Sequence, residues 1–202
     1  MALDARYSSN KDNNFIEVIN KYSENVNFVP DSDHISMQIN VDGRISECHT
    51  VSFAKVLEHG VYSIEMVIEK GAPDSSIGIA KASYDIPPQT IPWQHPHGEH
   101  IVLFGGKSSK PPGGVFYKGQ KTAGNAGYKN KQILRMEFDS ENGTLILFID
   151  NIQQPVMISK INEQIRFIIC LYDKGSQCNV HYLRQIAAPT SKHVPNEKFV
   201  EW

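Results

Sequence analysis

Apolar residues in this chain recur at every second position, and this two-residue period constrains the fold more than any other feature. The clearest case follows Gly60, where the apolar positions are Tyr62, Ile64, Met66 and Ile68. Successive side chains of a β-strand point to opposite faces, so such alternation predicts a strand with one buried face.

The same signal returns along the chain, interrupted by residues that favour turns. Residues 134–139 and 144–149 alternate on either side of Ser140-Glu141-Asn142-Gly143, and residues 165–172 are almost wholly apolar, as expected for a strand covered on both faces. Shorter strands are predicted at 77–80, 101–104, 115–117 and 180–186. Many short strands joined by turns predict an all-β fold, an antiparallel sandwich or barrel.

One early segment has helical spacing instead. Its apolar positions are Phe15, Ile16, Ile19 and Tyr22, which would share one face of a helix. We therefore expect a short amphipathic helix within an N-terminal extension at 1–27, followed by the sandwich at 28–187 and a tail at 188–202. The aromatic residues that end the tail are expected to dock on the domain.

Composition limits the class of protein and its partners. The net charge is −2, so a basic surplus that could bind a phosphate backbone is missing, and no nucleic acid partner is expected. No apolar run approaches the ~18 residues of a membrane span, and the polar first residues do not resemble a signal peptide. Three cysteines without a Cys-x-x-Cys pair (Cys48, Cys170 and Cys178) are expected to be reduced in a cytoplasmic protein.

The order of the predicted strands resembles that of the SPRY domain family. The matching segments are GVYSIEM at 60–66, SIGIA at 76–80 and FDSENGTLILFIDN at 138–151. The resemblance extends from Phe28 to Ile186. The chain departs from the family pattern at Asn130-Lys131-Gln132, where a Gly-Asp pair is common.

Membership of that family would imply a two-sheet antiparallel β-sandwich, a jelly roll of the concanavalin-like kind. It would also imply a non-catalytic interaction module that holds a peptide or protein partner in loops at one end of the sandwich. No cofactor, metal or membrane contact is part of this expectation.

A long segment rich in proline and glycine, residues 82–127, supplies most of the predicted loop length. Long loops in a compact domain are usually functional or mobile, and tryptophan and tyrosine dominate interface hot spots. Trp93 is the strongest candidate contact residue. The complete set of candidate partner-binding residues is Tyr84, Trp93, His95, Tyr117, Tyr128, Tyr172 and Asp173.

Three alternatives to a peptide-binding module require other residue patterns. A glycosidase needs two carboxylates flanking the scissile bond, and no Glu-x-Asp-x-x-Glu strand occurs. A zinc hydrolase would use His95, His97 and His100, but proline and glycine around them do not fix the rings as a helix would. A lectin on the same architecture stays the main rival, although scattered aspartates do not suggest a calcium site.

Overall fold

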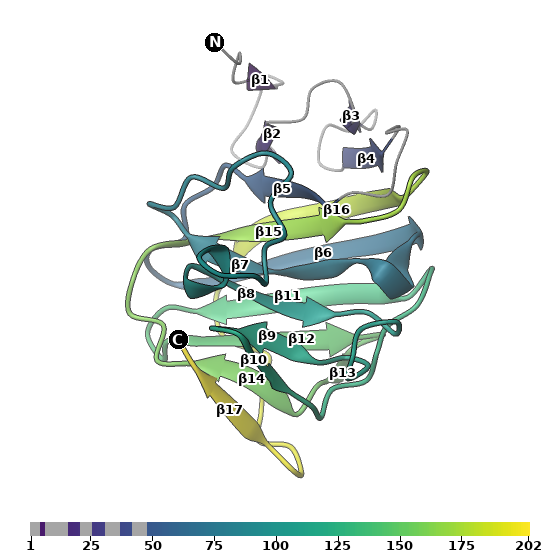
Figure 1. The fold of residues 1–202 in the computed structure, drawn as a ribbon. Helices are drawn as coiled ribbons and strands as arrows, with labels where there is room; N and C mark the ends of the chain where they lie inside the picture. Colours follow the sequence, from purple (N-terminus) through teal and green to yellow (C-terminus); the bar gives the residue numbers. More distant parts are fainter. Residues whose placement is uncertain (1–4, 7–15, 21–25, 31–36, 42–47) are drawn as a thin grey trace.

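The protein is an all-β sandwich of two sheets, seen in the computed structural model (Figure 1). The structure describes residues 5–6, 16–20, 26–30, 37–41 and 48–202. Two short 3₁₀ helices, η1 (Ala72–Asp74) and η2 (His97–Glu99), interrupt the described strands. The predicted two-sheet antiparallel sandwich is therefore confirmed.

The first sheet, sheet A, has eight strands, and all of their pairings are antiparallel. In spatial order its members are β1 (Ala5–Arg6), β2 (Val18–Asn20), β5 (His49–Phe53), β15 (Ile165–Leu171), β7 (Ser76–Lys81), β8 (Ile101–Gly105), β9 (Val115–Tyr117) and β10 (Gln120–Thr122).

The second sheet, sheet B, has nine strands and one parallel pairing, between β14 and β17. Its order is β17 (Lys198–Glu201), β14 (Val156–Ser159), β12 (Thr144–Ile149), β11 (Ile133–Asp139), β6 (Val61–Lys70), β16 (Gln177–Ile186), β4 (Met37–Val41) and β3 (Val26–Pro30), with β13 (Ile152–Gln153) on β12.

The main core lies between the two sheets and follows the alternation read from the sequence. Ile64 and Met66 of β6 contribute to it from sheet B, Ile77 and Ile79 of β7 contribute from sheet A, and all four side chains are fully buried. Phe167, in β15, also belongs to this core. Alternate positions along each strand thus supply the apolar layer.

A second apolar cluster covers the outer face of sheet A. Ile101 and Leu103 of β8 point away from the main core and pack with Ile168 of β15. The segment between β7 and β8 folds over them, and its Trp93 packs on the cluster. This cover explains why β8 and β15 read as continuous apolar runs rather than as alternating ones.

The predicted N-terminal helix is wrong for the residues that can be checked. Ile19 lies in β2, where it pairs with Ser52, and Val18 pairs with Phe53. Ile16 and Val18 are both buried while Glu17 is half-buried, which is a strand pattern. β-branched residues favour a half-buried strand, and pairing with β5 overrides the helical spacing. Phe15 and Tyr22 lie outside the described residues.

The predicted tail contains a strand, and of its aromatic residues Trp202 docks on the sandwich as expected, whereas Phe199 is 58% exposed. β17 runs beside β14 at one edge of sheet B (Figure 1). Directly after β17, the indole ring of Trp202 stacks on Tyr117 of sheet A with ring centroids 5.2 Å apart. Its Nε1 donates a hydrogen bond to Glu163 at 2.8 Å. The tail therefore joins the two sheets at one end of the sandwich.

Glu163 also forms an ion pair with Lys81, whose Nζ lies 2.9 Å from the Glu163 Oε1. Burial raises the pKa of the Glu163 carboxyl, but hydrogen bonds from Lys81 and Trp202 and the Lys81 charge outweigh it and lower the pKa below its ordinary value. The carboxylate thus stays ionised and holds the two donors together at neutral pH.

The cysteines differ from the expectation that all three are reduced. Cys48, directly before β5, forms a disulfide with Cys170 of β15, and only Cys178 is free, buried in the main core. Pairing of β5 with β15 brings the two sulfurs together although the cysteines are 122 residues apart in sequence. The spacing of cysteines in the sequence therefore could not predict this bond. The cytoplasmic location inferred from cysteine usage stays a prediction. Among the described residues, no helix is long and apolar enough to cross a membrane.

Candidate functional site

A pocket of about 280 Å³ opens on the outer face of sheet A, near the end where β8 turns toward β9. Its apolar lining comes from Trp93, Phe116 and Tyr172, which belong to three separate segments of the chain. Trp93 lies in the β7–β8 segment, Phe116 on the outer face of β9, and Tyr172 directly after β15. The fold therefore brings three aromatic rings to one cavity.

The polar lining comes from loops at the same end. Asp74 ends η1, and Ser108, Ser109 and Lys110 form the β8–β9 connection, while Lys121 projects from β10. The Lys121 Nζ lies 5.6 Å from the centroid of the Phe116 ring. The pocket therefore combines an aromatic wall with ammonium groups.

Tyr128 holds Ser75, one of the residues that line this pocket, from inside the core. Its side chain is fully buried, and its hydroxyl lies 3.0 Å from the Ser75 carbonyl and 3.1 Å from the Phe104 carbonyl. One O–H donor shared between these two oxygens ties the residue after η1 to the end of β8. Burial raises the pKa of the phenol, so the donor proton is retained at neutral pH.

Close backbone approach at Gly106 sets the β8–β9 loop against η1. A Cβ at this position would lie 2.3 Å from the Ala72 carbonyl oxygen and 2.6 Å from that of Pro73, so only glycine fits. The Gly106 amide donates to Ser75, and the Ser108 amide donates to Pro73. These contacts place Ser108, Ser109 and Lys110 at the pocket rim.

Two residues predicted from the sequence, Trp93 and Tyr172, line this pocket together. Trp93 is half-buried because one side of its indole packs on the outer apolar cluster, and Tyr172 is 36% exposed. Asp173 follows Tyr172, and its pKa is raised by burial and by the nearby charge of Asp74. Two carboxyl groups therefore lie next to the aromatic wall.

The remaining predicted residues lie elsewhere. Tyr128 is in the core, and Tyr117 is 5% exposed beneath Trp202, so neither presents a contact surface. Tyr84 stacks on His100 at 4.3 Å and hydrogen-bonds His97 at 2.5 Å, which turns both imidazoles toward the tyrosine. His95 is exposed on the same segment. Within the described parts of the chain, no group of three His, Cys, Asp or Glu side chains could hold a metal ion.

Sequence reasoning missed several residues of the pocket. Phe116, Lys110 and Lys121 were not candidates, because Phe116 looked like an ordinary strand residue and isolated lysines usually lie in solvent. Phe116 of β9 and Lys121 of β10 line the pocket from strands, whereas the sequence predicted a site formed by loops alone. The proline and glycine content of residues 105–114 was the only signal that marked this region.

Comparisons with known proteins were informative only at the level of structure. No protein-family profile matches the chain, and no curated protein sequence matches it. Solved structures, by contrast, superpose over most of its length. The SPRY domain of human HERC1 has a TM-score of 0.56 at 10% identity, covering 82% of this chain and 98% of that one.

The chain has a SPRY-like fold. The TRIM65 PSpry domain gives the same result, with a TM-score of 0.55 at 12% identity over 77% of this chain and 90% of that one. A further human SPRY domain has a TM-score of 0.54 at 9% identity, covering 76% and 94% of the two chains. At these identities the SPRY likeness concerns the fold, and the expected resemblance is confirmed at that level.

Proposed function

We propose that this protein is a non-catalytic interaction module that binds a peptide segment of a protein partner in the pocket walled by Trp93, Phe116 and Tyr172. The observation that carries the proposal is the convergence of these aromatic rings, from three segments, on one cavity of about 280 Å³. Aromatic side chains bury much area at little entropic cost, which is why they dominate binding hot spots.

Two of the serine hydroxyls at the pocket, those of Ser75 and Ser109, favour binding over catalysis. The Ser75 hydroxyl donates to the Ala72 carbonyl, and the Ser109 hydroxyl donates to the carbonyls of Gly106 and Pro111. The hydroxyl protons of these two serines are thus directed at backbone oxygens rather than at a general base, which a serine nucleophile requires. The likeness to SPRY domains supports the same reading by analogy of fold alone.

Selection from a random-peptide display library against the full chain tests the proposal without a known partner. Peptides enriched on the wild type would be synthesised and their Kd measured against Tyr172→Ala and Trp93→Ala. Each variant should weaken binding by about tenfold, the effect expected of a hot-spot side chain. Because Trp93 also packs on the outer apolar cluster, melting temperatures are measured for every variant, and Tyr172→Ala carries the conclusion if Trp93→Ala is unstable.

Phe199→Ala is the matched control, because Phe199 is an aromatic residue that is 58% exposed on β17 and does not line the pocket. Its Kd should stay within about twofold of the wild-type value. The proposal is wrong if the library yields no binder, or if the selected peptides bind Tyr172→Ala as tightly as wild type. Binding to a glycan array that is lost in Tyr172→Ala would instead establish the lectin alternative.

A further inference from the structure

The segment that forms much of the pocket is strongly basic, although the whole chain is slightly acidic. Residues 100–136 contain seven lysine or arginine residues and no aspartate or glutamate, in a protein with a net charge of −2. The basic residues are Lys107, Lys110, Lys118, Lys121, Lys129, Lys131 and Arg135. Such separation of charge creates a local positive potential that net charge conceals.

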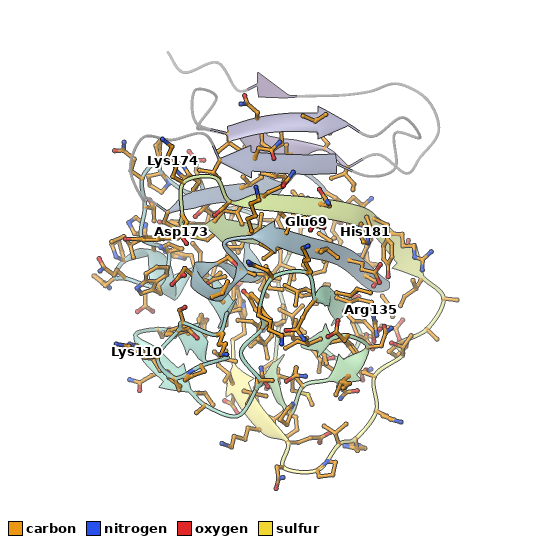
Figure 2. All side chains as sticks on the ribbon, turned by 90° about the vertical axis from the view of Figure 1, so that its right-hand side faces the viewer. Glu69, Lys110, Arg135, Asp173, Lys174 and His181 are labelled. Atoms are coloured by element: carbon orange, nitrogen blue, oxygen red, sulfur yellow. A yellow bond between two sulfur atoms is a disulfide. The ribbon has the colours of Figure 1, made fainter. Side chains whose placement is uncertain are left out.

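The structure concentrates part of this charge at the pocket. Lys110 and Lys121 line it, and both are exposed. Lys107 is also exposed and belongs to the same β8–β9 loop, which holds Ser108 and Ser109 on the pocket wall. Figure 2 shows Lys110 on the same side of the molecule as Asp173 and Lys174, whereas Arg135 lies toward the opposite side.

Within the described part of the chain, Lys107, Lys110 and Lys121 have no carboxylate at ion-pair distance; the ion pairs found there are those of Lys81, Arg135, Lys160, His181 and His193. The ammonium groups at the pocket are therefore available to an anionic ligand. A carboxylate bound beside an aromatic wall is screened less than one in open solvent.

A pair of carboxyl groups stands on another part of the same rim. Asp74 lines the pocket, and Asp173 follows the lining residue Tyr172 and is close enough to Asp74 for the two charges to interact. The rim is thus dipolar, with lysines from β10 and the β8–β9 loop and aspartates from η1 and the β15–β16 turn. Such a rim is complementary to a ligand with an anionic group at one position and hydrogen-bond donors at another.

We propose that the pocket takes an acidic peptide segment, in which an apolar side chain packs against Trp93 and Tyr172 and an aspartate or glutamate contacts Lys110 and Lys121. This inference rests on the proposed function and adds the chemistry of the partner. The backbone amides of such a segment can donate to Asp74 and Asp173. A uniform polyanion lacks these donors, since its phosphates or sulfates meet the aspartate pair with like charge.

Charge reversal at the pocket provides the test. Peptides selected from the display library should be enriched in Asp and Glu, and the double variant Lys110→Glu/Lys121→Glu should weaken their binding by at least about tenfold. Replacing the peptide's own Asp and Glu with Asn and Gln should weaken wild-type binding to a similar extent. Affinity should also fall as salt rises from about 0.05 to about 0.5 M.

The double variant Lys55→Glu/Lys192→Glu is the matched control, because both lysines are exposed, neither lines the pocket, and the change in net charge is the same. It should leave the Kd within about twofold. Equal weakening by both double variants would mean a long-range charge effect and overturn the inference. So would competition by oligothymidylate or heparin at the affinity of the peptide.

The two proposals fail in different ways. If Tyr172→Ala weakens binding while Lys110→Glu/Lys121→Glu does not, the pocket binds peptides but the acidic preference is wrong. A different result is that selected peptides are acidic and lose affinity on charge reversal but not in Tyr172→Ala. The aromatic wall is then not the binding surface, and both the proposed function and the apolar part of this inference are wrong.

Discussion

Replacing Trp202 with alanine should destabilise the whole sandwich, although this residue lies beyond the last strand. Its indole stacks on Tyr117 with an interplanar angle of 2°, its Nε1 donates to Glu163 at 2.8 Å, and the Lys81 Nζ lies 5.9 Å from the ring. Tyr117 and Lys81 belong to sheet A, whereas Trp202 follows a strand of sheet B. The substitution therefore removes a contact that ties the sheets together.

The magnitude follows from these contacts. An aromatic pair contributes about 0.5–1.5 kcal/mol beyond the area that it buries, and a hydrogen bond to a charged group contributes about 1.5–3 kcal/mol in a buried setting and less where water competes. Trp202 and Glu163 are both half-buried. We expect Trp202→Ala to lower the free energy of unfolding by about 2–3 kcal/mol, below the range of about 3–5 kcal/mol for fully buried aromatic residues.

Urea denaturation followed by circular dichroism measures this change, because the far-ultraviolet signal does not depend on the tryptophan that is removed. Phe199→Ala is the control from the same strand, and its 58% exposure predicts a loss within about 0.5 kcal/mol. Trp202→Phe should fall between the two, since it keeps the stacking and loses the donor. Equal losses for Trp202→Ala and Phe199→Ala would refute the claim that the tail joins the sheets through its indole.

Three further outcomes follow from buried and paired groups. The pKa of Glu163 is lowered in the folded protein, so its carboxylate stabilises the fold above pH 4.5, and this contribution is lost as the pH falls through the folded pKa. The urea midpoint of Glu163→Gln should therefore depend less on pH in that acidic range than the midpoint of the wild type. Tyr128→Phe should cost about 0.5–1.5 kcal/mol in the same assay, because the carbonyls of Ser75 and Phe104 lose a shared donor; no loss would contradict the link that Tyr128 makes between them. Denatured protein should show one thiol, Cys178, before reduction and three after it, and three before reduction would show that the Cys48–Cys170 bond does not form.

The thiol count also bears on where the protein works. Disulfides persist mainly in oxidising compartments, so the redox state of Cys48 and Cys170 in the cell tests the cytoplasmic location, which stays a prediction. Alkylation of the protein at the moment of cell lysis, in its native source, would measure the state that the compartment maintains. Fully alkylated cysteines would support the cytoplasm.

Local pattern was sufficient for the strands that carry the sandwich. A few residues are enough to predict the alternating strand β6, the turn between β11 and β12 and the apolar strand β15. The period of a strand and the residue types of a turn are local properties of the sequence. Local periodicity failed at β2, where Val18 and Ile19 are held extended by pairing with β5, more than thirty residues away in sequence.

The candidate site required the tertiary structure. Sequence alone selected Trp93 and Tyr172, since tryptophan and tyrosine dominate interface hot spots, but the same reasoning selected Tyr117 and Tyr128, which are buried. An aromatic residue in a core and one at a binding surface look the same in the sequence, because burial depends on which residues pack against it. Phe116 became a pocket wall only because the β7–β8 segment folds over sheet A beside it. Strand order and loop path decide such contacts, and they depend on pairings between residues far apart in the chain.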